Sequence, residues 1–267
     1  MFPILKLTKK IAKRSIERFG HRRTMVGDPR HDDIYVVEFP KSGITWLGFL
    51  VANVELRLSG IDREVTFFNR QQFFVDVHKA KGQLVDPPIQ RRYIKSHANY
   101  NPLYPYVIYL YRNPTDVMVS YYNFMLEKGA KIPFPSFVRS KRYGIPAWIN
   151  HIDGWVLRND RFTKLHLMTY EDLISEPQAV LDQWFNSIGI SVSERILNEA
   201  IAASSMENMK ASEDHFRRFN PTYNRVFVGK HGKQRREQLV TPPIAEYIAE
   251  NCNYITDFID EHRRKYR

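Results

Sequence analysis

A lysine, a glycine and two hydroxyl side chains stand close together in residues 40–46 (PKSGITW), between an apolar run and a helical stretch. Backbone N–H groups at such a loop and helix start can cradle an anion, and a glycine allows close approach. Lys41 adds a positive charge, while Ser42 and Thr45 add hydroxyl donors. The pattern indicates a site for a phosphate or sulfate group. A plain turn with a solvated lysine is the alternative for this segment by itself.

A second set of polar groups lies in residues 107–124 (VIYLYRNPTDVMVSYYNF). Arg112 follows an apolar run, and arginine offers a planar fork of donors that matches phosphate. Ser120 comes eight residues later, about two turns along the expected helix and so on a similar face. The segment predicts a second phosphate contact. An ion pair between Arg112 and Asp116 in the first helical turn is the alternative that stays open here.

A candidate general base lies in residues 95–97 (KSH), just past another apolar run. A hydroxyl group is a poor nucleophile until its proton is removed, and an imidazole with a pKa near 6.5 suits that task at neutral pH. The chain has nine histidines, and a lone histidine is more often structural. His97 differs from the others in its place after a strand, beside Lys95.

The hydrophobic pattern predicts the scaffold that would bring these groups together. Strands are expected at 34–39, 92–96, 106–111 and 166–169, and helices at 46–59, from 115 onward, and at 177–188, 193–203 and 243–264. Residues 60–90 are expected to be irregular with short helices, and 129–146 and 211–241 to be loops.

Strands that alternate with helices predict an α/β fold with a central, mainly parallel sheet. The carboxyl ends of parallel strands meet at one edge of the sheet, where ligands of α/β proteins bind. Lys41, His97 and Arg112 each follow an expected strand. We therefore expect the three side chains at one edge of the sheet.

Length and composition limit the class of protein. The chain has 267 residues, of which 43% are hydrophobic and 13% aromatic, and this composition predicts a globular core. Cys252 is the one cysteine, so no disulfide can form within the chain and a reducing, cytoplasmic location is expected. No apolar run reaches the length of about 18 residues that a transmembrane helix needs.

Residues 1–30 form a basic arm that holds nine Lys and Arg against two acidic residues, +7 of the net charge of +11. The weakly basic remainder, residues 31–267, is expected to be one domain that does not bind nucleic acid. Residues 4–19 have the period of a basic amphipathic helix. Two interpretations stay open: the helix packs on the domain or on a second copy in a homodimer, or it lies on an anionic membrane surface.

Together, the segments PKSGITW, KSH and YRNPTDVMVSYYNF resemble the motifs of the soluble, cytosolic type of sulfotransferase that uses 3′-phosphoadenosine 5′-phosphosulfate (PAPS). The family pattern is P-K-S-G-T-T-W after the first strand, K-T-H after another, and strand–R-[ND]-P–helix ending in V-S-Y-Y. Residues 170–173 (YEDL) are similar to a fourth motif, Y-E-D-[LM]. The resemblance implies a P-loop-like three-layer αβα fold, sulfuryl transfer from PAPS to a hydroxyl acceptor, and no metal ion.

The resemblance also implies a role for each matching residue. Lys41 would neutralise charge on the leaving phosphate oxygen, Lys95 would hold the transferring group, and His97 would deprotonate the acceptor. The residues implied in cofactor binding are Lys41, Ser42, Gly43, Ile44, Thr45, Trp46, Arg112, Ser120, Tyr170, Ser204, Gly229 and Lys230.

Each part of the cofactor has its own contacts under this resemblance. The loop 42–45 would cradle the 5′-phosphate. Trp46 and Tyr170 would contact the adenine, with Ser204 on the same side. Arg112 and Ser120 would bind the 3′-phosphate, the group that distinguishes PAPS from ATP.

The chain departs from the family pattern in two places. Ile44 replaces a threonine, so one hydroxyl donor is lost while the backbone N–H remains. The last family motif, R-K-G-x-x-G-x-W, reads FVGKHGKQR at 227–235, without the Arg-Lys pair and the tryptophan. Arg225 or Lys230 is expected to supply the lost charge.

The expected reaction is an in-line displacement at sulfur, by analogy with phosphoryl transfer. The acceptor class stays open among small alcohols or phenols, glycans and lipid-linked sugars. A kinase of the P-loop type is disfavoured because the sequence G-x-x-x-x-G-K-[ST] is missing. A non-catalytic binding protein is disfavoured by the presence of Lys41, Lys95 and His97 together.

Overall fold

The structure is a computed structural model, and it describes residues 21–77, 87–157, 164–223, 226–227 and 233–266. The expected amphipathic helix at 4–19 lies outside these residues, as do Arg225, Gly229 and Lys230. Within the described ranges, no helix combines the length and the apolar character that crossing a membrane requires.

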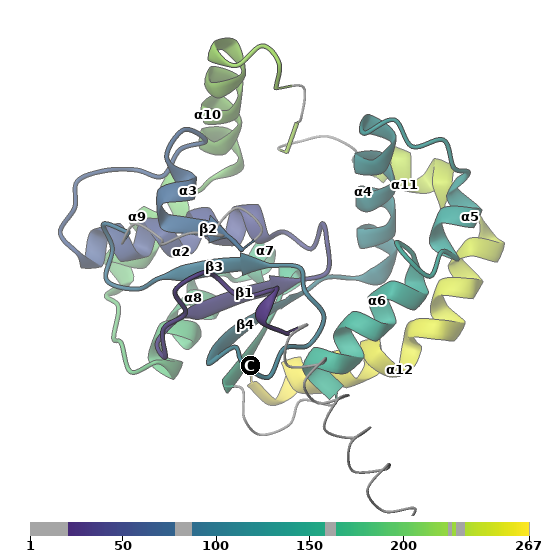
Figure 1. Cartoon of the computed structure of the whole chain (residues 1–267), viewed down its shortest axis with the longest axis horizontal. Coiled ribbons are helices and arrows are strands. Elements are labelled where there is room, and N and C mark those ends of the chain that lie inside the picture. Colours follow the sequence, from purple (N-terminus) through teal and green to yellow (C-terminus); the bar gives the residue numbers. More distant parts are fainter. Residues whose placement is uncertain (1–20, 78–86, 158–163, 224–225, 228–232, 267) are drawn as a thin grey trace, which may run out of the picture.

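A five-stranded parallel sheet forms the centre of the molecule, in the order β2-β3-β1-β4-β5 (Figure 1). The strands are β1 (Ile34–Glu38), β2 (Phe74–Asp76), β3 (Tyr93–Ser96), β4 (Tyr106–Tyr111) and β5 (Lys164–Thr169). The expected mainly parallel α/β fold is confirmed. The edge strand β2 was not expected, since only three residues of it are extended.

Helices cover both faces of the sheet, which makes three layers (Figure 1). Successive side chains of a strand point to opposite faces, so the side chains of β1 pack into two hydrophobic cores, one on each face of the sheet. Ile34 and Val36 belong to the core under α2 (Ile44–Leu58), α8 (Pro177–Ser187) and α9 (Glu194–Ala203). Tyr35 and Val37 belong to the core under α4 (Pro114–Glu127), α6 (Ile145–Ile152) and α12 (Pro242–Tyr266). The remaining helices are α3 (Arg70–Phe73), α5 (Phe134–Val138), a π-helical turn (Asp153–Leu157), α7 (Tyr170–Ser175), α10 (Met206–Phe219) and α11 (Lys233–Leu239).

The prediction of loops was wrong for two segments, which contain helices. Residues 129–146 contain α5 and the start of α6, and each of these helices has a proline in its first turn, where no N–H is needed. Residues 211–241 contain the second half of α10 and all of α11. Ser205 caps α10 by accepting the N–H of Asn208 at 3.2 Å. Helix α2 also starts two residues earlier than expected, at Ile44.

The strand register places the predicted site residues at one edge of the sheet. Val37 of β1 lies opposite Ser96 of β3, so Glu38 and His97 are the next residues on the two strands. Glu38 also lies opposite Leu110 of β4, two residues before Arg112. The carboxyl ends of β1, β3 and β4 therefore converge where the loop 40–43 leads into α2.

Candidate active site

The loop after β1 has an unusual backbone path. Lys41 has φ 80° and Gly43 has φ 116°, both in the left-handed region that glycine favours. Ser42 is buried, and both its N–H (3.2 Å) and its hydroxyl (2.9 Å) donate to the carbonyl of Phe39. A Cβ atom on Gly43 would strike the ring of Tyr170. The loop is thus closed on itself and packed tightly against the first residue of α7.

Arg112 contacts both the backbone of this loop and the ring of Tyr170. Its Nη1 donates to the carbonyl of Lys41 at 3.1 Å, and its guanidinium lies 4.3 Å from the ring centre of Tyr170. Its Nε is buried and has no hydrogen-bond partner in the part of the chain that the structure describes. Asp116 pairs instead with Arg236 at 3.0 Å. The alternative of an ion pair between Arg112 and Asp116 was therefore wrong.

A hydrogen bond to the backbone fixes one ring nitrogen of His97. Its Nδ1 lies 3.1 Å from the carbonyl oxygen of Glu38, and a carbonyl only accepts, so Nδ1–H is the donor. This hydrogen bond favours the tautomer in which Nε2 keeps its lone pair. Burial, together with the positive charge of Lys95, lowers the pKa of His97 to about 3. The imidazole is neutral at pH 7 and able to accept a proton at Nε2.

Two lysines and Arg112 give the site its positive charge. Burial lowers the pKa of Lys41 from its ordinary value, and the cations Lys95 and Arg112 lower it further, against the opposing charges of Glu38 and Glu127. Lys41 therefore lies close enough to both Lys95 and Arg112 to be repelled by each of them. A bound anion would relieve that repulsion.

Glu38 is a site residue that the sequence analysis did not single out. Its side chain is 2% exposed, and its Oε2 accepts the N–H of Ile44 at 2.8 Å. Its Oε1 lies 3.8 Å from Nδ1 of His97. Burial raises the pKa of Glu38 to about 7, although Lys95 and Lys41 pull it down. The available signal was the one acidic residue in the otherwise apolar run IYVVEF at 34–39.

The remaining predicted residues lie around the same loop. Trp46 donates from Nε1 to the carbonyl of Ser204 at 3.0 Å, and its ring meets that of Tyr170 edge-on at 5.9 Å. Ser204 is fully buried, and its hydroxyl accepts from Asn53 at 3.0 Å. Ser120 is half-buried on α4. The hydrogen bond to Ser204, the residue that follows α9, thus fixes the indole ring of Trp46.

Two aromatic rings that the sequence analysis missed flank the lysine of the loop. The Nζ atom of Lys41 lies 5.1 Å from the ring centre of Phe124 and 5.4 Å from that of Phe227. Phe227 comes from the degenerate last motif, and its N–H donates to the buried Glu213 at 2.6 Å. This segment of the motif therefore reaches the loop although its Arg-Lys pair is missing.

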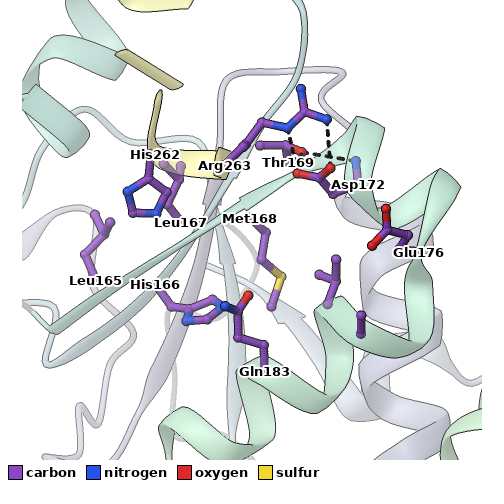
Figure 2. A pocket seen from close by; sticks show the side chains of 12 residues that line it. Leu165, His166, Leu167, Met168, Thr169, Asp172, Glu176, Gln183, His262 and Arg263 are labelled. Carbon is purple, nitrogen blue, oxygen red and sulfur yellow. Dashed lines mark hydrogen bonds and ion pairs between the residues drawn. The ribbon is translucent and has the colours of Figure 1, made fainter. Parts of the chain in front are cut away.

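A cavity of about 330 Å³ opens elsewhere, along β5, between α8 and the end of α12 (Figure 2). Its lining includes His166, Asp172, Gln183, His262 and Arg263. None of the predicted site residues that the structure describes lines it. The convergence of charged groups after β1, β3 and β4 is therefore a separate place in the fold.

Comparisons with known proteins identify the family of the chain. A model of the sulfotransferase domain matches residues 31–254. Human sulfotransferase 1C2 is 27% identical over 228 residues, which cover 76% of this chain and 71% of that protein. Bovine sulfotransferase 1E1 is 28% identical over 218 residues, which cover 74% and 72%.

Solved structures share the fold. Retinol dehydratase in a complex with retinol and PAP (3′,5′-bisphosphoadenosine) has a TM-score of 0.62 at 16% identity, over 86% of this chain and 82% of that one. A mouse sulfotransferase complexed with PAP has a TM-score of 0.54 at 19% identity, over 84% of both chains. The chain belongs to the family of PAPS-dependent sulfotransferases and is an enzyme of that class.

Proposed function

We propose that the protein transfers a sulfuryl group from PAPS to a hydroxyl acceptor by in-line displacement, with His97 as the general base. The observation that carries this proposal is the convergence of Lys41, His97 and Arg112 on the end of β1. Arg112 touches the loop of Lys41 at 3.1 Å, and His97 touches the last residue of β1 at 3.1 Å.

The residues present fit a doubly phosphorylated adenosine. The buried Nε of Arg112 is a donor without a partner among the described residues, and a phosphate oxygen would satisfy it. Ser120, on the following helix, is the second donor that we assign to the 3′-phosphate. The loop 42–45 and Lys41 would hold the 5′-phosphosulfate, with Trp46, Tyr170 and Ser204 on the adenine side. Gly229 and Lys230 stay expected contacts of the same cofactor.

Each side chain has a distinct task in this mechanism. Bound PAPS supplies an activated sulfuryl group and a phosphate leaving group. His97 takes the proton of the acceptor hydroxyl at Nε2, because Nδ1–H is engaged with the carbonyl of Glu38. Lys41 and Lys95 stabilise the negative charge that develops on the leaving and transferring oxygens.

The acceptor is assigned only as a hydroxyl-bearing molecule: a small alcohol or phenol, a glycan or a lipid-linked sugar. Transfer of ³⁵S from PAPS into fractionated extract of the source cells, followed by identification of the labelled product, tests the proposal. We expect a labelled sulfate ester. If the wild-type protein binds PAP and labels no fraction, a non-catalytic binding role would replace this proposal.

The general base is tested by His97→Ala. Turnover of PAPS should fall by about 10²- to 10⁴-fold, while the affinity for PAP measured by calorimetry stays near that of the wild type. Wild-type turnover by this variant would remove the assignment.

Thermal shifts with PAP and with ATP–Mg²⁺ separate a sulfotransferase from a kinase, and we expect PAP alone to stabilise the protein.

A further inference from the structure

A buried carboxylate joins three elements at the centre of the site. Glu38 ends β1, its Oε2 accepts the N–H of Ile44 at the start of α2, and its Oε1 lies 3.8 Å from Nδ1 of His97, just past β3. Its own carbonyl holds the same Nδ1 at 3.1 Å. One residue therefore contacts the loop that we assign to the cofactor and also the proposed base.

Titratable side chains from the loop after β1, from β3 and from β4 face Glu38. Lys41 approaches from the loop, and Lys95 from β3, and both lower the pKa of Glu38 against the effect of burial. Tyr109 lies beside it on β4, where burial and the charge of Glu38 raise the pKa of the phenol. The carboxylate is the negative partner in a group of cations.

His97 has few other sources of negative charge. Lys95 and His151 both disfavour its protonated form, and Asp76 of β2 favours it only as the smallest contribution. When His97 takes a proton, the imidazolium would stand beside Lys95 with the carboxylate of Glu38 on its Nδ1 side. A nearby carboxylate favours the charged form of an imidazole.

We propose that Glu38 is a positioning residue for sulfuryl transfer, whose carboxylate orients His97 from the Nδ1 side and balances the charge that His97 gains with the acceptor's proton. The inference rests on the proposed role of His97. In the step, the acceptor O–H proton moves to Nε2, the acceptor oxygen bonds to sulfur, and the bond from sulfur to the leaving phosphate oxygen breaks. The Nδ1 proton stays in place between the carbonyl and carboxylate oxygens of Glu38.

A purely structural role would give a different pattern, because Glu38 also accepts the N–H of Ile44. Glu38→Gln keeps the shape and an oxygen acceptor for that N–H but loses the charge. Glu38→Asp keeps the charge on a shorter side chain. If charge matters most, the glutamine variant is the slower enzyme. If only the loop contact matters, the aspartate variant is the slower one.

The first readout needs no acceptor. In the PAP complex at pH 8, ¹H–¹⁵N NMR of the His97 ring should show the Nδ1–H tautomer as the main form in the wild type and a larger share of the Nε2–H tautomer in Glu38→Gln, because the charge that favours a proton on Nδ1 is lost. The affinity for PAP, measured by calorimetry, should stay within about threefold or become tighter, since a negative charge beside an anion site is removed. An unchanged tautomer population of His97 would overturn the inference.

The second readout is turnover. We expect kcat of Glu38→Gln to fall about ten- to a hundredfold. Because the pKa of Glu38 is about 7, wild-type kcat should rise through pH 7 as Glu38 ionises, and this rise should be absent in Glu38→Gln. Glu38→Gln added to His97→Ala should cause no further loss, because both act through one imidazole. An additive loss would contradict the inference while leaving the base assignment intact, whereas an active His97→Ala would remove the base assignment itself.

Glu55→Gln is the matched control. Glu55 is a fully buried carboxylate in α2 that accepts from Tyr93 at 2.7 Å and from Arg91 at 3.0 Å, and burial also raises its pKa. Its loss removes the same charge from the interior without touching His97. We expect its kcat, pH profile and His97 tautomer population to match the wild type. A loss equal to that of Glu38→Gln would show a general effect of buried charge and overturn the inference.

Discussion

Gly43 is the residue where the loop between β1 and α2 has the least room. Its φ of 116° suits glycine, and any Cβ would enter the ring of Tyr170. Gly43→Ala should therefore displace Tyr170 and the loop, and it should weaken PAP binding by at least about tenfold in calorimetry. The strained backbone alone costs roughly 1–2 kcal/mol.

Gly60→Ala separates the backbone strain from the collision. Gly60 also has a positive φ, of 67°, but nothing lies within 4 Å of the position of its Cβ. This variant should lose a comparable amount of stability and keep the PAP affinity of the wild type. Equal PAP affinities in the two alanine variants would contradict the packing role of Gly43.

At the residue scale, side-chain type and position after a strand were enough to predict that Lys41, His97 and Arg112 would lie together. The role of Glu38 was not predicted, because the sequence around a single acidic residue in an apolar strand does not show which groups stabilise its buried charge. Those groups, Lys95 and the N–H of Ile44, come from other parts of the chain. Only the register between β1 and β3 brings them to it.

At the element scale, α12 fastens the helix that begins with Tyr170. Arg263 makes a two-pronged ion pair with Asp172 of α7, with both N–O distances at 2.7 Å, beside the cavity at β5 (Figure 2). Asp172 also accepts the hydroxyl of Thr169, the residue that caps α7, at 2.7 Å. The contact fixes α7, which in turn packs Tyr170 over Gly43.

Arg263→Ala should lower the free energy of unfolding by about 1.5–3 kcal/mol, the range for hydrogen bonds to charged groups. Urea unfolding measures this change, and the affinity for PAP should fall by less than about tenfold. Arg264→Ala is the control, because Arg264 is exposed and, among the described residues, its hydrogen bond goes to a carbonyl of its own helix, that of Asp260. A loss of the same size in both variants would exclude a specific role of the contact with Asp172.

The elements themselves were predicted where the hydrophobic period was strong, as for β1, β4 and α9. The expected loop at 129–146 failed because Pro135 and Pro146 looked like breakers, although both stand in the first turn of a helix. Strand β2 was not predicted, because its three residues form a strand through their pairing with β3. Tertiary contacts decided these segments, and the sequence pattern does not contain them.

At the scale of the whole molecule, three histidines make the fold sensitive to acid. Burial is the first cause that lowers the pKa of His97 to about 3 and those of His151 and His166 to about 4. A depressed pKa contributes stability above the unfolded value near 6.5, and this contribution is lost as the pH falls toward the folded value. We expect the free energy of unfolding to decrease between pH 6.5 and 4.

His151→Gln tests this sensitivity at one site. His151 is 2% exposed and should account for roughly 3 kcal/mol of the decrease, at 1.36 kcal/mol per pKa unit. The variant should show a shallower fall with acid in urea unfolding, whereas His31→Gln, at an exposed residue, should keep the wild-type slope. Equal slopes in all three proteins would contradict the buried, neutral state of His151.

The central claim is that one edge of the sheet binds an adenosine with phosphates at both the 3′ and the 5′ positions. Calorimetry of the full chain with PAP and with 5′-AMP tests it most directly, alongside Arg112→Ala. We predict that the wild type binds PAP about 10- to 100-fold more tightly than 5′-AMP, which is the value of one charge-assisted contact, and that the variant loses this preference. Equal affinities of the wild type for the two nucleotides, or no binding of PAP, would contradict it.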